Sequence, residues 1–473
     1  MFLHTPLYLF CLLIFAFIYW RLPAGLIRQV ILVIISYLFY ALFDARFALL
    51  LAGMSITIYF IGQAIPSSPH PFLLAVIGVA LNLSVLFFFK YTGFFLDSLH
   101  TILAPSGISN LPIGMSLLLP IGISFYTFQG IGYVVGIYRK KLVPAGLFDL
   151  MLYLAFFPKL IAGPLVNPKQ FLDELHHLPD RLSGTDQSAA LRLLLSGLVK
   201  KVLIADSLAS LAEVAFRAAG QPGNPSFPTL LFIQGFYLYA IEIYADFSGY
   251  TDLARGSALL MGFHLPENFR QPYLSTTVAD FWNRWHMSLT AWFREYFFFP
   301  LSRALLIRTR QRWSRQIQVS VNMLTMILIG FWHGANWTFV AWGAWHGLLI
   351  SFQRLTGWKP QKGWQTILST LITFHLVGIG WVLFHSSDFA GVVRFFAGMT
   401  SLKNLYWIPD FWPPLLLAGG MMTGLDLIER GSLSLPKPIQ QVGIITAVVV
   451  LTGLTVLALV RGSDVHPFIY GNF

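Results

Sequence analysis

The hydrophobic positions of this chain gather into long uncharged runs, and short clusters of charge separate the runs. Phe47–Ile65, Pro71–Phe89 and Val442–Val460 each hold 19 residues without a formal charge. An α-helix rises about 1.5 Å per residue, so such a run spans a hydrocarbon core of roughly 30 Å. The run 316–353 is uncharged over 38 residues, which is enough for two helices at membrane depth. The pattern therefore predicts membrane-spanning helices.

Several further runs match this pattern less completely. They are Pro6–Trp20, Gln29–Phe43, Leu111–Tyr138, Leu147–Leu165, Pro228–Tyr244, Gly363–Ser387 and Phe411–Leu425. Together the runs predict an all-α polytopic membrane protein with about ten to thirteen membrane helices. The first run has no basic residues before it and ends in Arg21-Leu22-Pro23, so we interpret it as a retained helix rather than a cleaved signal peptide.

The composition agrees with a membrane protein and excludes a soluble one. Hydrophobic residues make up 56% of the 473 residues and charged residues only 11%, against about 25% charged residues in soluble domains. We expect one continuous membrane domain, with N-terminal helices over 1–110, a central core over 111–385 and C-terminal helices over 386–473. The single cysteine, Cys11, excludes an intrachain disulfide and a cysteine-based zinc site.

The net charge of +11 comes from basic residues that lie between the apolar runs. They include Arg139, Lys140 and Lys141, then Lys200 and Lys201, then Arg303, Arg308, Arg310, Arg312 and Arg315. This placement is typical of loops on the cytoplasmic side of a membrane and argues against nucleic acid as a partner. The stretch Arg303–Arg315 is the firmest anchor of the topology, and it could alternatively bind an anionic acyl donor.

The segment 281–296 is rich in aromatic residues and too charged for a comfortable membrane span. Trp282, Trp285, His286, Leu289 and Phe293 fall on one face of a helix. The more polar flank carries Arg284 and Ser288. We expect one short helix at the membrane interface. The pattern leaves open whether His286 is structural or functional.

His333 lies in the uncharged run, about 18 residues beyond the last arginine of the basic stretch. An ionisable residue at membrane depth needs a hydrogen-bond partner or a function, and function is the default hypothesis. Gly330 and Gly334 bracket this histidine and leave open space or allow close backbone approach beside it. The alternative is a histidine bonded to a neighbouring helix.

Two other features are weaker candidates. A second Trp-His-Gly places His346 thirteen residues after His333, which is about 140° around a helix, so the two should not ligate one metal. With no His-Glu-x-x-His spacing either, we expect no metal. Asp246 and Asp252 lie beside hydroxyl residues and could orient a substrate or the catalytic imidazole, or could bond helix ends and pair with Arg255.

Six blocks in order along the chain resemble the membrane-bound O-acyltransferase superfamily, and within it the bacterial branch that includes the alginate O-acetyltransferase membrane subunit. The resemblance covers about residues 120 to 473. The blocks are Pro120–Gln129, Phe157–Pro164, Asp246–Tyr250, Leu265–Phe269, Phe281–His286 and Trp332–Trp337.

The resemblance implies a ring of membrane helices around a funnel or tunnel, where a cytoplasmic acyl donor meets an acceptor from the outer side. It implies that His333 is the catalytic histidine and His286 the second important one. His333 would take a proton from the acceptor hydroxyl, because imidazole titrates near neutral pH. Further expected substrate contacts are Trp332, Asn336, Trp285, Arg284 and Asp246.

The resemblance also sets the expected partners. The donor is acetyl-CoA or another acyl thioester, used as a substrate with no bound cofactor. The acceptor is an exopolysaccharide, reached directly or through a separate extracytoplasmic acetyltransferase. The protein is expected in the bacterial cytoplasmic (inner) membrane, in contact with the lipid bilayer. Two alternatives remain open, namely D-alanyl transfer toward teichoic acid and a transporter without enzymatic activity.

Overall fold

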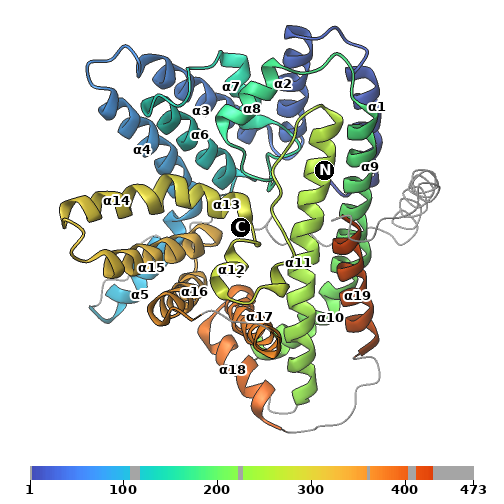
Figure 1. Ribbon diagram of the computed structural model, residues 1–473, viewed down its shortest axis with the longest axis vertical. Coiled ribbons are helices and arrows are strands. Elements are labelled where there is room, and N and C mark those ends of the chain that lie inside the picture. The colour runs from blue at the N-terminus through green and yellow to red at the C-terminus, as the bar shows by residue number, and fades with distance from the viewer. Residues whose placement is uncertain (1–2, 107–117, 222–226, 359–362, 403–411, 430–473) are drawn as a thin grey trace. The chain divides into compact units, whose positions relative to one another are not determined.

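The computed structural model describes residues 3–106, 118–221, 227–358, 363–402 and 412–429 (Figure 1). Within these ranges every regular element is a helix, which confirms the predicted all-α class. The chain divides into two compact units. Unit 1 holds residues 1–195 and 250–266, and unit 2 holds 196–249 and 267–473. The division into 1–110, 111–385 and 386–473 stays a prediction.

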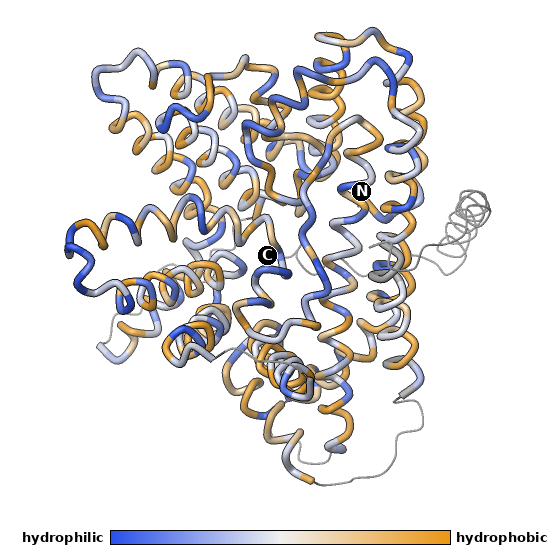
Figure 2. The backbone as a smooth tube through the Cα atoms, viewed as in Figure 1, coloured by the Kyte–Doolittle hydropathy of each residue, from blue (hydrophilic) through white to orange (hydrophobic). Residues whose placement is uncertain are grey.

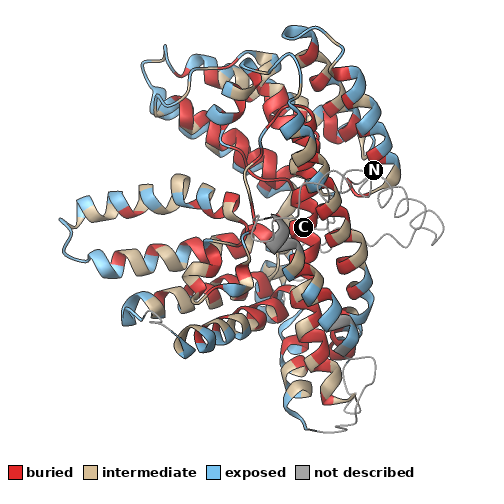
Figure 3. Cartoon of the chain, turned by 45° about the vertical axis from the view of Figure 1, so that its right-hand side comes forward, coloured by how far each residue is buried: buried red, intermediate tan, exposed pale blue. Residues whose placement is uncertain are grey.

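Four helices are long and apolar enough to cross a membrane by length and composition. They are α3 (Ala45–Ala64), α4 (Pro71–Lys90), α11 (Thr229–Leu260) and α17 (Trp364–His385). Three shorter apolar helices are α1 (Pro6–Tyr19), α2 (Leu26–Ala41) and α18 (Phe389–Thr400). Apolar residues recur along the tube in Figure 2, and Figure 3 shows exposed residues along the same helices that carry buried ones. The predicted run Val442–Val460 lies outside the described residues.

The first helices of unit 1 begin at capping residues that the sequence supplies locally. The Thr5 hydroxyl accepts a hydrogen bond from the Tyr8 amide at 3.3 Å, and Pro6 occupies the first turn of α1. Asp44 caps α3 by accepting from the Arg46 amide at 2.8 Å. The remaining helices of this unit are α5 (Thr92–Leu103), α6 (Ile123–Tyr138), α7 (Leu147–Ala155), α8 (Pro168–His176) and most of α9 (Gly184–Leu198).

The run Leu147–Leu165 is helical only to Ala155, although its remainder is buried. Pro158, Gly163 and Pro164 interrupt the helical pattern there. The buried Lys159 ammonium donates to the Gln129 side-chain oxygen and, at 2.5 Å, to the Tyr153 carbonyl. Irregular backbone in this apolar unit is therefore held by polar side chains that are themselves buried.

Unit 2 contains the aromatic segment 281–296 and both Trp-His-Gly motifs. A π-helical segment, η2 (Val199–Ala205), leads into α10 (Asp206–Gly220). After the N-terminal part of α11 come α12 (Val278–Trp282), α13 (Met287–Phe293), the π-turn η4 (Arg294–Phe298) and α14 (Phe299–Arg308). The unit continues through α15 (Ser314–His333) and α16 (Trp337–Thr356) to α17, α18 and α19 (Trp412–Glu429).

Two expectations for unit 2 were wrong in detail. The basic stretch Arg303–Arg315 is not one loop, because α14 continues to Arg308 and α15 begins at Ser314. Lys200 and Lys201 do not lie in a loop but in η2, where both are buried. The sequence places these lysines beside apolar residues, but it does not show that Asp206 and Asp246 lie next to the Lys201 ammonium in the fold.

Helices α15 and α16 pack closely through glycines. A Cβ atom on Gly330 would lie 2.2 Å from the Phe339 carbonyl oxygen, and one on Gly343 would lie 2.3 Å from the Met326 carbonyl oxygen. Small residues of this kind let membrane helices approach until their backbones touch. The glycine before His333 therefore serves close helix packing, which is one of the two uses that the sequence allowed.

We predict that Gly330→Ala lowers the stability of the protein, because the added methyl group must push α16 away. Overpacking of this kind costs about 1–3 kcal/mol. Gly53→Ala in α3 is the matched control, since nothing lies within 4 Å of its Cβ position. We expect Gly53→Ala to be neutral or stabilising by about 1 kcal/mol. Thermal unfolding in detergent measures both, and equal melting temperatures would contradict the packing argument.

Candidate active site

His286 lies in the turn between α12 and α13 and has a left-handed backbone conformation, with φ 44° and ψ 52°. The expected single helix over 281–296 is therefore wrong, because the chain breaks at this histidine. A left-handed conformation costs a non-glycine residue about 1–2 kcal/mol. Such strain persists only where the surroundings enforce it, and it is common at functional sites.

Asn268 enforces the break from another part of the chain. Its carbonyl oxygen accepts a hydrogen bond from the Met287 amide at 3.0 Å, and its side-chain oxygen accepts from the Ser288 amide at 3.0 Å. The Arg270 amide also donates to the Arg284 carbonyl at 2.9 Å. A helix start needs acceptors for its first amides, and here Asn268 supplies them for Met287 and Ser288.

The His286 ring is completely buried, and its surroundings are aromatic. The Phe247 ring meets it edge-on at 4.7 Å between centroids, and the Trp332 ring lies at 6.1 Å. Within the described residues neither ring nitrogen has a hydrogen-bond partner. Burial lowers the pKa of His286, which lies outside the four candidate spans, to about 3. The imidazole is therefore neutral at physiological pH, with one ring nitrogen that can donate a hydrogen bond and one that can accept.

His333 is the last residue of α15 and is 1% exposed. Gly334 follows in an extended conformation and ends the helix. The His333 ring lies 6.3 Å from the His286 ring between centroids, and Trp342 and Phe384 pack edge-on against it at 5.2 and 5.3 Å. The fold thus brings together two histidines that are 47 positions apart in the sequence.

This arrangement suits proton transfer to or from one small group. With 6.3 Å between their centroids, the two rings border the same small region of the enclosure. A neutral imidazole can take a proton from a hydroxyl, and a second imidazole can donate to an oxygen that gains charge. The aromatic walls exclude water and so strengthen such interactions.

Of the other predicted site residues, Trp332 lies beside the histidine pair, with its ring 4.9 Å from that of His333. The Trp285 ring packs instead on Trp381 and Phe269, at 4.8 and 4.9 Å. Arg284 donates to the Asp280 carboxylate at 3.1 Å. All these contacts are structural, so the predicted role of Trp285 and Arg284 in substrate binding stays a prediction.

Asn336 caps α16. Its side-chain oxygen accepts from the Thr338 amide at 3.1 Å, while its side-chain nitrogen donates to the Ser387 carbonyl at 2.8 Å. These two bonds tie the start of α16 to the segment that follows α17. A contact between Asn336 and substrate, which the sequence suggested, would have to use the atoms that already form these bonds.

Asp246 forms a buried ion pair with Lys201 at 2.8 Å, and the same ammonium lies 2.8 Å from Asp206. The sequence suggested Arg255 as a partner of the two aspartates, but Arg255 contacts Asp252, at 3.6 Å. Burial alone would lower the pKa of Lys201, yet the two carboxylates more than offset this effect and raise it. Asp246 thus neutralises a lysine that is buried in η2 and not in the loop that the basic residues predict.

His346 belongs to the aromatic packing rather than to the histidine pair. The Trp282 indole nitrogen donates to its Nδ1 atom at 3.2 Å. The Trp342 ring contacts both His346 and His333, at 5.0 and 5.2 Å between centroids. In the part of the chain that the structure describes, no three His, Cys, Asp or Glu side chains form a group that could hold a metal.

The fold and the site define a multi-pass helical membrane protein with two buried imidazoles whose ring centroids lie 6.3 Å apart. Residues 117–358 match the model of MBOAT, the membrane-bound O-acyltransferase family, and the chain belongs to this family. The matched range contains both histidines and the rings of Phe247, Trp332 and Trp342, while Phe384 lies beyond it. The protein is therefore an O-acyltransferase.

Curated relatives agree with this assignment. The chain is 38% identical to "Probable alginate O-acetylase AlgI" of Pseudomonas aeruginosa over 85% of its own length and 74% of the relative's. It is 32% identical to "Peptidoglycan O-acetyltransferase" of Helicobacter pylori over 85% and 80%. It is 29% identical to "Teichoic acid D-alanyltransferase" of Bacillus subtilis over 58% and 70%.

We predict that Asp246→Asn lowers stability by about 3–5 kcal/mol, because it leaves Lys201 with only one of its two carboxylates in a buried site. Asp280→Asn is the matched control, since the Arg284–Asp280 pair is partly exposed and worth at most about 1 kcal/mol. Thermal unfolding and membrane abundance measure both variants. Normal stability together with a raised KM in Asp246→Asn would instead support a substrate contact.

We also predict that His286→Gly is more stable than His286→Ala by about 1 kcal/mol. Both variants lose the imidazole, but only glycine adopts the left-handed conformation without a steric penalty. Both should lose acyl transfer. Comparison of their melting temperatures isolates the backbone strain, and an Ala variant as stable as the Gly variant would show that the strain is negligible.

Proposed function

We propose that this protein moves an acetyl group from a cytoplasmic thioester, such as acetyl-CoA, toward hydroxyl groups of an extracytoplasmic polysaccharide. The observation that carries the proposal is the buried pair His286–His333 within the matched family region, with ring centroids 6.3 Å apart. The names of the relatives support acetyl as the acyl group, since the alginate and peptidoglycan enzymes match 85% of the chain. We place the protein in the bacterial cytoplasmic membrane.

In the proposed reaction His333 accepts the proton of the acceptor hydroxyl as its oxygen attacks the thioester carbonyl carbon. The new carbon–oxygen bond forms, the carbon–sulfur bond breaks, and His333 returns the proton to the leaving thiolate. His286 donates a hydrogen bond to the carbonyl oxygen while that oxygen carries negative charge. A neutral imidazole can fill this role, because one of its ring nitrogens carries a proton to donate.

Trp332 is the best supported of the proposed substrate contacts, since its ring borders both histidines. The other four predicted contacts would act indirectly, through the position of the site. Trp285 and Arg284 would hold the turn at His286, Asn336 the start of α16, and Asp246 the buried charge of Lys201. We further propose that the membrane helices surround a funnel in which donor and acceptor meet. A separate extracytoplasmic acetyltransferase could take the acetyl group onward to the polymer.

D-alanyl transfer toward a teichoic acid is the second candidate. The relative from Bacillus subtilis that carries this name supports it. The support is weaker, because that match covers 58% of this chain while the alginate and peptidoglycan relatives match 85%. The two candidates share the same histidine chemistry and differ in the donor.

We predict that His333→Ala abolishes polymer acetylation in cells while membrane abundance stays normal. General-base catalysis contributes about 10²–10⁴-fold to a rate, so acetylation should fall at least a hundredfold. His346→Gln is the matched control, because His346 is also buried within a Trp-His-Gly tripeptide but lies outside the pair, and glutamine retains an acceptor for Trp282. Mass spectrometry of the extracted polymer measures the acetyl content.

The donor is tested with the purified protein in lipid. It should transfer acetyl from acetyl-CoA, and it should not transfer D-alanine from a carrier-protein thioester. Full acetylation by His333→Ala would overturn the catalytic role of this histidine. Preference for the D-alanyl donor would replace acetylation with the second candidate function.

A further inference from the structure

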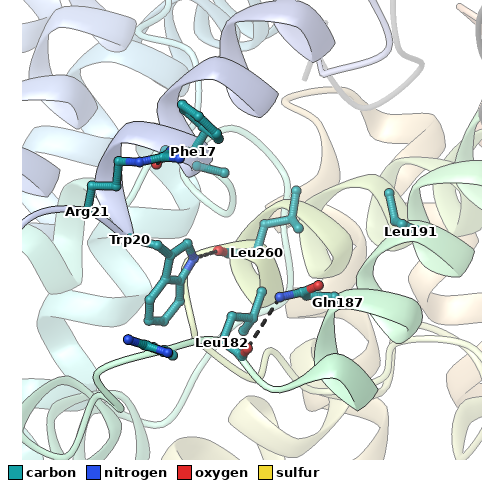
Figure 4. A pocket seen from close by; sticks show the side chains of 9 residues that line it. Phe17, Trp20, Arg21, Leu182, Gln187, Leu191 and Leu260 are labelled. Carbon is teal, nitrogen blue, oxygen red and sulfur yellow. Dashed lines mark hydrogen bonds between the residues drawn. The ribbon is translucent and has the colours of Figure 1, made fainter.

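Unit 1 contains a pocket of about 680 Å³ that the acyl-transfer chemistry described above does not use. The residues that give it its character are Phe17, Trp20, Arg21, Arg181, Leu191 and Leu260. Figure 4 shows Phe17 and Arg21 on one side of the pocket and Leu191 and Gln187 on the other, with Trp20 and Leu260 between them. The lining combines two guanidinium groups with apolar and aromatic surface.

The positive charge in this pocket is not neutralised by a carboxylate of the described residues. The Arg21 side chain is exposed, donates to the Phe17 carbonyl at 3.2 Å and lies 3.3 Å from the centroid of the Phe17 ring. Arg181 is exposed and forms no hydrogen bond or ion pair with other described residues. No acidic residue lines the pocket. An anionic group therefore suits it best.

The walls of the pocket are fixed by hydrogen bonds. The Trp20 indole donates to the Leu260 carbonyl at 2.8 Å, and the Gln187 side chain donates to the Leu182 carbonyl at 3.3 Å (Figure 4). Arg28 is buried and donates to the carbonyls of Pro179 and Asp180, both at 2.9 Å. This arginine thereby holds the loop that carries Arg181, so the hydrogen bonds of the fold fix the shape of the pocket.

An exposed apolar stripe leads along α1 to this pocket. Leu7, Phe10, Ile14 and Phe17 lie three or four positions apart, hence on one helix face, and are 63%, 64%, 45% and 63% exposed. Arg21 continues the same spacing just beyond the helix end. In a membrane protein such a stripe faces lipid tails, and arginine with tryptophan at its end is typical of the headgroup level.

We propose that this pocket binds an anionic phospholipid of the surrounding bilayer. The phosphate accepts hydrogen bonds from Arg21 and Arg181, and one acyl chain lies along the stripe Leu7–Phe17. Guanidinium groups bind phosphate with paired, charge-assisted hydrogen bonds. The apolar stripe favours a lipid over a free phosphate, because a soluble anion would leave that surface unused. The proposal does not depend on the identity of the acyl donor.

The test measures lipids that remain on the full-length protein purified in mild detergent, with phosphatidylglycerol and phosphatidylcholine supplied in equal amounts. Native mass spectrometry counts the bound lipids. We expect the wild-type protein to retain phosphatidylglycerol at least tenfold over phosphatidylcholine. The double variant Arg21→Gln, Arg181→Gln should lose roughly tenfold or more in phosphatidylglycerol binding, since two charge-assisted contacts are removed.

Arg192→Gln is the matched control. Arg192 is exposed on the same helix as Gln187 and Leu191 but does not line the pocket, so its removal should leave lipid binding unchanged. A second variant, Arg181→Lys, keeps the charge but loses the paired geometry, and we expect it to bind at an intermediate level. Circular dichroism and size-exclusion profiles establish that each variant is folded, which is expected because the substituted side chains are exposed.

Three results would overturn the proposal. The first is equal retention of the two lipids, and the second is unchanged binding by the double variant. The third is full displacement of phosphatidylglycerol by millimolar inorganic phosphate, coenzyme A or the chain-free headgroup glycerophosphoglycerol, which would indicate a site for a free anion. Failure of displacement by these soluble anions supports the lipid.

Discussion

In a chain as apolar as this one, each break in a helix leaves amide and carbonyl groups that water cannot satisfy, so another part of the protein must supply their partners. The turn at His286 depends on this constraint. Asn268 gives both its backbone and its side-chain oxygen to the first amides of α13. Because those bonds hold α12 and α13 apart, His286 keeps its left-handed conformation and its ring lies near that of His333.

Buried polar side chains in this protein differ in how fully they are hydrogen-bonded. Lys201 and Arg28 are surrounded by carboxylate or carbonyl oxygens, so burial of their charge is compensated and they stabilise a neighbouring helix or a loop. His286 differs, since its two ring nitrogens are enclosed by aromatic rings. A buried group with unused hydrogen-bonding capacity requires an explanation, and a role at the site is the one proposed for His286.

Much of the fold followed from the order of residues. The runs Phe47–Ile65 and Pro71–Phe89 predicted α3 and α4 nearly to their ends, because length and hydrophobicity alone determine whether a helix can cross a bilayer. The break at 281–296 could not be predicted in this way. Its apolar spacing fits one helix well, and the group that opposes a continuous helix, Asn268, is thirteen or more positions away. Lys201 was misplaced for the same reason, since its partner Asp246 is 45 positions later.

The sequence by itself determined that this is an all-helical membrane protein, and its motifs made His333 and His286 the candidate site residues. Periodicity, run length and local motifs carry this information because each concerns neighbours along the chain. Only the tertiary structure decided that the two imidazoles share one aromatic enclosure, that Asp246 neutralises Lys201, and that His346 bonds to Trp282 outside the pair. Each of these facts depends on contacts between segments that are distant in the sequence. The close packing of α15 on α16 is one such contact, and it fixes the position of the α15 end at His333.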